Sequence, residues 1–212
     1  MCIARSPLAE IAAGLRAAPA PLQHWAEVDA LFRSWVGEPD FRTELKAHLL
    51  RLTGSDRAIG TGRSKETTTH DAWCLADDPA DEFSLWLHLY KPQRDWRAGY
   101  ANTVHNHRYH FSTTILTGSY LHQRFDARLD PGGREVRGAR LTETVIRRAG
   151  SHEVMLSEQF HRIPRAEDGT ITFLVKSSPV RPWSLSYDPG RGTSWQHTSR
   201  RERLTELAEH LR

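Results

Sequence analysis

The chain has 212 residues, of which 38% are hydrophobic and 26% are charged, so it can bury a core and is neither a disordered chain nor a fibre. No apolar run approaches the roughly 18 residues needed to span a bilayer, which argues against a membrane protein. The net charge is only +3, and no basic stripe alternates with aromatic residues, so we expect no nucleic-acid partner.

The first part of the chain predicts helices. Apolar residues recur at helical spacing in segments 8–15, 25–35 and 41–52, which Pro19, Pro21, Gly37 and Pro39 separate. Segment 199–212 has the same spacing. We therefore expect a helical flank over residues 1–65, packed on a larger unit, and a C-terminal helix over residues 199–212.

The beginning of the chain gives no sign of export. Residues 1–15 contain Arg5 and Glu10 and no uninterrupted apolar stretch, so we expect no signal peptide. The two cysteines, Cys2 and Cys74, match no paired spacing. The simplest expectation is a reduced, cytoplasmic protein.

From about His70 the spacing of apolar residues changes to two. Phe83, Leu85, Leu87 and Leu89 alternate with more polar residues, which predicts a strand. Similar short segments follow, several of them separated by turn residues: 103–107, 111–116, 119–125, 136–147, 153–156, 170–176 and 183–187. Many short strands with close turns predict a β-sandwich or barrel over residues 66–198, within one structural domain.

Three histidines of this region are candidate metal ligands. His105 and His107 lie two apart on a predicted strand, so their imidazoles would point to the same side. His161 lies at the start of a later strand, and three imidazoles can share one ion while leaving coordination positions open. The alternative is a solvent-facing pair on an edge strand and a structural histidine before Pro164.

The order of these residues resembles the cupin superfamily, whose first motif is a His-x-His pair followed by a glycine. His105, His107 and Gly118 match the first motif, and Gly150 and His161 match the second. The resemblance covers residues 70–187. It implies a mainly β, cupin-type double-stranded β-helix (jelly-roll) barrel, with the N-terminal helices and the C-terminal helix outside it.

The ligand set lacks the carboxylate of the usual first motif. That residue would fall at Phe111 or Ser112, and neither is acidic, so the set resembles the three-histidine branch of thiol (cysteine-type) dioxygenases. Three neutral ligands leave the full charge on a dipositive ion, which favours anionic substrate atoms. The resemblance implies a mononuclear non-haem iron(II) oxygenase that acts on a small polar metabolite, such as an amino acid or thiol derivative, with dioxygen.

Features of cysteine dioxygenase itself are missing. No cysteine follows His107, segment 176–178 holds no histidine in place of the Ser-x-His-x-Tyr relay, and segment 69–73 holds no arginine. Cysteine is therefore a doubtful substrate.

Two other functions stay open. Imidazole also binds zinc, nickel, manganese and copper, so a non-redox metallo-cupin that works as an isomerase, lyase or hydrolase is one alternative. A cupin that binds a small molecule without turnover is the other. A homodimer is compatible with the sequence, which does not fix the oligomeric state.

Seven further residues are candidates for the site. Tyr187 is the candidate acid or hydrogen-bond donor, and Arg124 could pair with a substrate carboxylate. Metal-bound imidazoles need a partner for the second ring nitrogen, for which His110 and Glu158 are candidates. The remaining three lie on strand faces that suit either a ligand-binding barrel interior or an ordinary solvent face: Tyr120, His88 and Tyr90.

Overall fold

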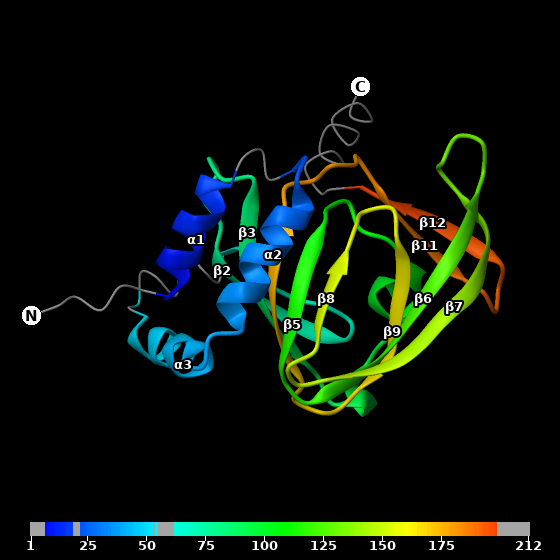
Figure 1. Cartoon of the computed structure of the whole chain (residues 1–212). Coiled ribbons are helices and arrows are strands. Elements are labelled where there is room, and N and C mark those ends of the chain that lie inside the picture. Colours follow the sequence, from blue (N-terminus) through cyan, green and yellow to red (C-terminus); the bar gives the residue numbers. More distant parts are fainter. Residues whose placement is uncertain (1–6, 19–21, 53, 55–61, 199–212) are drawn as a thin grey trace, which may run out of the picture.

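Two antiparallel sheets of six strands each form the body of the protein (Figure 1). This computed structural model describes residues 7–18, 22–52, 54 and 62–198, so the predicted C-terminal helix over residues 199–212 lies outside the described residues. Sheet A contains, in order, β1 (Lys65–Glu66), β2 (His70–Ala76), β3 (Phe83–Tyr90), β10 (Ile171–Ser177), β5 (Phe111–Thr117) and β8 (His152–Met155). Sheet B contains β12 (Thr193–His197), β11 (Ser184–Asp188), β4 (Val104–His105), β9 (Phe160–Ala166), β6 (Ser119–Leu129) and β7 (Val136–Arg148).

The order of the strands is that of a jelly roll. The chain passes from β3 in sheet A to β4 in sheet B, then to β5 in sheet A, and after the β6–β7 hairpin of sheet B it returns through β8, β9 and β10 in the same alternating way. The neighbouring sets are β3-β10-β5-β8 in one sheet and β4-β9-β6-β7 in the other. This double-stranded β-helix confirms the predicted mainly β, cupin-type barrel.

Three helices cover the outer face of sheet A, as the sequence predicts (Figure 1). They are α1 (Pro7–Ala17), α2 (Trp25–Val36) and α3 (Phe41–Arg51). Phe32 of α2 stacks on Phe173 of β10 with ring centroids 5.5 Å apart, and Leu85 of β3 belongs to the same buried cluster. Asp29 of α2 is also hydrogen-bonded to His152 of β8, with 2.8 Å between Oδ1 and Nε2. No helix among the described residues combines the length and apolar character needed to cross a bilayer.

The turn between β5 and β6 depends on Gly118, the glycine of the first motif. Its φ is +76°, a conformation that side chains rarely adopt, and an added Cβ would overlap Oγ1 of Thr170 and lie 2.9 Å from its Cα. Gly150 has a φ of +86° but nothing within 4 Å of an added Cβ. Both glycines therefore need a positive φ, but only Gly118 lacks space for a side chain.

We expect Gly118→Ala to destabilise the protein by about 3 kcal/mol, because it adds overpacking against Thr170 to the backbone strain. Gly150→Ala, which meets only the backbone strain, should cost about 1 kcal/mol. Urea denaturation of the two variants measures both costs. An equal decrease in the free energy of unfolding of the two variants would show that the contact with Thr170 does not contribute to the cost.

Candidate metal centre

Adjacent strands bring His105 and His161 together. β4 pairs with β9, and these two histidines lie directly opposite each other in the register. β4 ends at His105, so His107 is not on the strand as predicted but in the loop that follows. Asn106 fixes this loop, because its Oδ1 accepts a hydrogen bond from the backbone N–H of Leu185 at 2.7 Å and its own N–H donates to the Leu185 carbonyl oxygen at 3.1 Å.

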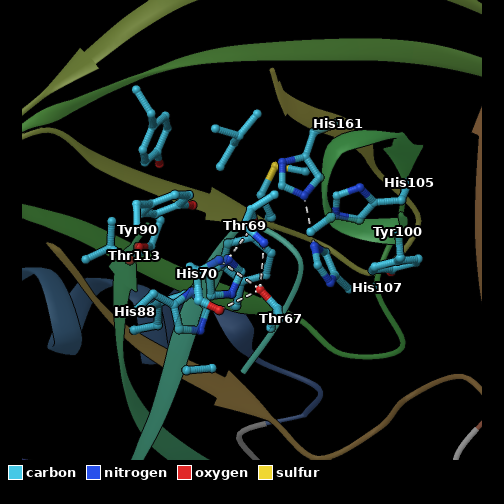
Figure 2. A pocket seen from close by; sticks show the side chains of 18 of the residues that line it. Thr67, Thr69, His70, His88, Tyr90, Tyr100, His105, His107, Thr113 and His161 are labelled. Atoms are coloured by element: carbon cyan, nitrogen blue, oxygen red, sulfur yellow. Dashed lines mark hydrogen bonds between the residues drawn. The ribbon is translucent and has the colours of Figure 1, made fainter. Parts of the chain in front are cut away.

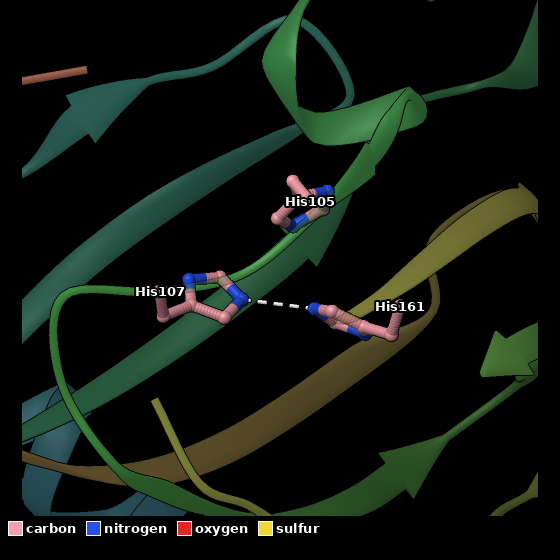
Figure 3. Close-up of side chains that lie close together, drawn as sticks. All are labelled: His105, His107 and His161. Atoms are coloured by element: carbon pink, nitrogen blue, oxygen red, sulfur yellow. Dashed lines mark hydrogen bonds between the residues drawn. The ribbon is translucent and has the colours of Figure 1, made fainter. Parts of the chain in front are cut away.

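The three predicted ligands converge (Figure 3). One ring nitrogen from each of His105, His107 and His161 lies within 4.8 Å of the others, and Nε2 of His107 is 2.9 Å from Nε2 of His161. Two nitrogens that each lie 2.0–2.1 Å from a shared ion at right angles are about 3 Å apart. The set therefore has the spacing of a metal site.

The partner of His105 leaves one of its ring nitrogens available to a metal. Nδ1 lies 2.9 Å from the carbonyl oxygen of Thr103. A carbonyl oxygen only accepts hydrogen bonds, so Nδ1 must carry the proton and Nε2 keeps its lone pair. Burial lowers the pKa of His105 to about 4, so the ring is neutral at neutral pH.

A buried chain of side chains orients His161 in the same way. Nδ1 of His161 lies 2.8 Å from Nε2 of His122, and Nδ1 of His122 lies 3.0 Å from Oε1 of Glu153, in a contact too bent for a regular hydrogen bond. Because an ionised carboxylate only accepts, the protons belong on the two Nδ1 atoms, which leaves Nε2 of His161 with its lone pair. Carboxylate–histidine pairs behind a metal ligand raise the basicity of the ligand.

Contacts with His122 and Arg124 keep Glu153 ionised, and Arg147 lies beside it. Nη2 of Arg124 and of Arg147 lie 2.8 Å and 3.4 Å from Oε1 of Glu153. Burial alone would raise the pKa of this carboxyl, but contacts with His122 and Arg124 lower it to about 2. The negative charge of Glu153 is thus matched by arginine within the protein.

The three histidines lie in the wall of a cavity of about 350 Å³, which is near the lower end of the range for small-molecule sites. Phe111 is one of the two positions at which the resemblance would place an acidic residue, and its ring lies 5.0 Å from that of His107. Much of the wall is aromatic or aliphatic, including Tyr90, Phe111, Tyr120, Met155, Ile163 and Leu174. Figure 2 shows His105, His107 and His161 on one side of the cavity and His70 and His88 on another.

Three of the predicted substrate-binding residues line this cavity, namely His88, Tyr90 and Tyr120. Contact of these residues with a substrate stays a prediction. Arg124 is not among the lining residues, because its guanidinium points to the carboxylate of Glu153.

The other three predicted residues lie outside the cavity. Tyr187 packs beside the buried cluster that contains Val104, since the two residues are paired between β11 and β4 and share a face away from His105. Nδ1 of His110 accepts a hydrogen bond from the backbone N–H of Ser157. Glu158 is exposed. The second ring nitrogens of His105 and His161 therefore have Thr103 and His122 as partners, in place of the predicted His110 and Glu158.

Four further residues line the cavity although they were not among the residues predicted for the site: His122, Glu153, His70 and Lys176. His122 shares a strand face with Tyr120, which was a usable signal. Lys176 interrupts the otherwise apolar end of β10, in a chain that has only four lysines.

No protein-family model matches the chain, and no curated protein matches it. Solved structures are similar over part of its length. The formate complex of oxalate decarboxylase from Lactobacillus farciminis is 17% identical, covering 56% of this chain and 31% of that one, with a TM-score of 0.38. Ectoine synthase from P. lautus is 13% identical, covering 70% of this chain and 90% of that one, with a TM-score of 0.40. The chain spans about a third of the length of the oxalate decarboxylase, and the fold assignment above rests on the order of the strands.

Proposed function

We propose that the protein is a mononuclear non-haem iron(II) oxygenase that acts on a small polar metabolite. One observation carries the proposal: three neutral imidazoles, with one ring nitrogen each within 4.8 Å of the others, converge in the wall of a largely apolar cavity. This donor set suits a dipositive transition metal, and no carboxylate belongs to it.

In this proposal His105, His107 and His161 hold the metal. Iron(II) in such a set would supply one-electron redox chemistry and open coordination positions. Because all three ligands are neutral, the site would attract an anionic group of the substrate. Glu153 acts through His122 to keep the proton of His161 on Nδ1, away from the metal side of the ring.

The cavity wall would exclude water and orient the substrate. Phe111, Met155 and Leu174 offer apolar surface. Burial raises the pKa of Tyr109, which also lines the cavity, to about 12, so its hydroxyl stays protonated and can donate a hydrogen bond to the substrate. A dry cavity of this kind strengthens each polar contact that the substrate makes.

The test begins with metal analysis of protein produced without metal supplementation. We then expect anaerobic loading with iron(II) to one ion per chain, and oxygen uptake with at least one member of a panel of thiols, amino acids and other small carboxylates. The His107→Ala variant, treated in the same way, is the control. Failure to bind iron, or uptake no faster than with the variant, contradicts the proposal.

A zinc-dependent, non-redox enzyme is the second candidate, because three histidines are also the ligand set of catalytic zinc sites. Zinc in the isolated protein, together with turnover that does not depend on oxygen, would favour it. Ligand binding that is unchanged after metal removal would instead favour a binding protein.

A further inference from the structure

Lys176 presents a buried ammonium group to the cavity, away from the three histidines. It lies near the end of β10, where it pairs with Phe111 of β5 on one side and Ser84 of β3 on the other. The residue lines the cavity although it is only 7% exposed. The ring of Tyr109 lies between the two regions, 5.1 Å from the ring of His107 and 5.6 Å from Nζ of Lys176.

The contacts of Nζ are with neutral groups. It lies 3.0 Å from Nε2 of His88 and 4.2 Å from the ring centroid of Trp86. His88 is stacked against His70, with ring centroids 4.3 Å apart, which fixes the imidazole that receives the hydrogen bond. Within the described part of the chain, Nζ has no carboxylate within 4.0 Å.

Two acidic residues line the cavity among those that the structure describes, and both are already neutralised. Glu153 is held by Arg124 and Arg147, as described above. The other, Glu66, pairs with Lys91 and with Arg97, the latter at 3.1 Å. A buried cation without a counter-ion is costly, and since none of the described carboxylates balances Lys176, a bound ligand would supply the missing anion.

We propose that Lys176 binds a carboxylate group of the ligand, and that the substrate is a small molecule with anionic groups at both ends. One end would meet Lys176, and the other would meet the metal held by the three histidines. The second half of this statement rests on the proposed function, whereas the Lys176 half does not. Burial lowers the pKa of Lys176 to about 7, so a bound carboxylate would also stabilise its charged form.

The competing explanation is a purely structural lysine that is satisfied by His88 and by the face of Trp86. The two explanations differ in what Lys176→Met does to the free protein. If the lysine is structural, its removal lowers the free energy of unfolding of the free protein. If the lysine serves to bind a ligand, its buried charge destabilises the ligand-free protein. We therefore expect Lys176→Met to be at least as stable as the wild type.

The binding test uses succinate and its monoamide, succinamate, which have similar shape and differ by one negative charge. Titration calorimetry is done on the metal-free protein and on the zinc-loaded protein, in which no redox turnover occurs. We expect the zinc-loaded wild type to prefer succinate by about ten-fold or more, because succinamate loses a charge-assisted contact at one end whichever way it binds. In the metal-free protein succinamate can turn its own carboxylate to Lys176, so the measurement there is the affinity for succinate, which Lys176→Met should weaken by about ten-fold or more. The affinities for malonate and glutarate, a shorter and a longer dicarboxylate, test which distance between the two carboxylates fits the cavity.

Lys176→Met should reduce this preference to less than about three-fold, whereas Lys65→Met should retain it. Lys65 is the matched control, since it lines the same cavity but is exposed. Equal affinity of the zinc-loaded wild type for succinate and succinamate overturns the proposal of a ligand with two anionic ends, and this comparison needs no variant. So does failure of all three dicarboxylates to bind at millimolar concentration.

The outcomes also separate the two proposals. If the protein binds no metal but binds succinate in a way that Lys176→Met weakens, the metal enzyme is wrong and the carboxylate site stands. If it binds metal and Lys176→Met changes nothing, the carboxylate site is wrong and the metal centre stands.

Discussion

Replacing His107 by alanine is expected to abolish stoichiometric binding of a divalent metal. The loss should exceed the roughly 10- to 100-fold that removal of an outer-shell partner costs, because a direct ligand is removed. His107 is the cleanest of the three ligands to replace. Within the described part of the chain its side chain is hydrogen-bonded to His161 alone, so the change leaves the partners of the other two rings in place.

His110→Ala is the matched control, since His110 lies on the same loop and outside the cavity. Both variants are loaded with iron(II) or zinc, dialysed, and analysed for metal per chain, with circular dichroism to verify the fold. His110→Ala should keep one ion per chain. Retention of a full equivalent by His107→Ala would mean that the three imidazoles do not share a metal.

Glu153→Gln is expected to cost about 3 kcal/mol of stability and to weaken metal binding by about 10- to 100-fold. The substitution leaves Arg124 and Arg147 without their buried anion, and it replaces the carboxylate beside Nδ1 of His122 by a neutral amide, which is a weaker acceptor. Glu143→Gln is the control, because Glu143 contacts the same two arginines but its side chain is 46% exposed, against 5% for Glu153. An exposed pair should contribute less than about 1 kcal/mol.

The difference in free energy of unfolding between the wild type and Glu153→Gln should also depend on pH. The pKa of Glu153 is lowered from 4.5 to about 2, so its contribution is present above about pH 4.5 and is lost as the pH falls towards 2. Urea denaturation of the wild type and Glu153→Gln should therefore give a constant gap from pH 5 to 7 that narrows in acid. Two results would contradict this role of the buried carboxylate: a stability difference at pH 3 as large as that at pH 7, or an equal loss of stability in Glu153→Gln and Glu143→Gln.

Most of the fold could be predicted because hydrophobic spacing reports which faces are buried. The alternation of Phe83, Leu85 and Leu87 in β3 and the helical spacing of residues 25–35 both reflect one shared core. Two strands gave weak signals for physical reasons. β9 contains Pro164 and two arginines, and β12 lies at the edge of its sheet, where Trp195 is largely exposed.

The ligands of the candidate site were easier to predict than their partners. His105, His107 and His161 follow a motif order, whereas His122 and Glu153 lie on different sheets and meet only because the sheets face each other. No spacing in a sequence encodes which residues meet across a barrel. Tyr187 illustrates the same limit, since the β11–β4 register decides which way its side chain points.

The helices on sheet A have a consequence for how the cavity can adapt. β3, β10 and β5 are buried on both faces, with Leu85 and Phe173 against the helices and Trp86, Phe111 and Leu174 on the inner side. Tight packing on both sides resists displacement of these strands. A differently shaped molecule would have to be accommodated by exchanging side chains on this wall, or by movement of the opposite wall and of the lining segments 65–69 and 100–101.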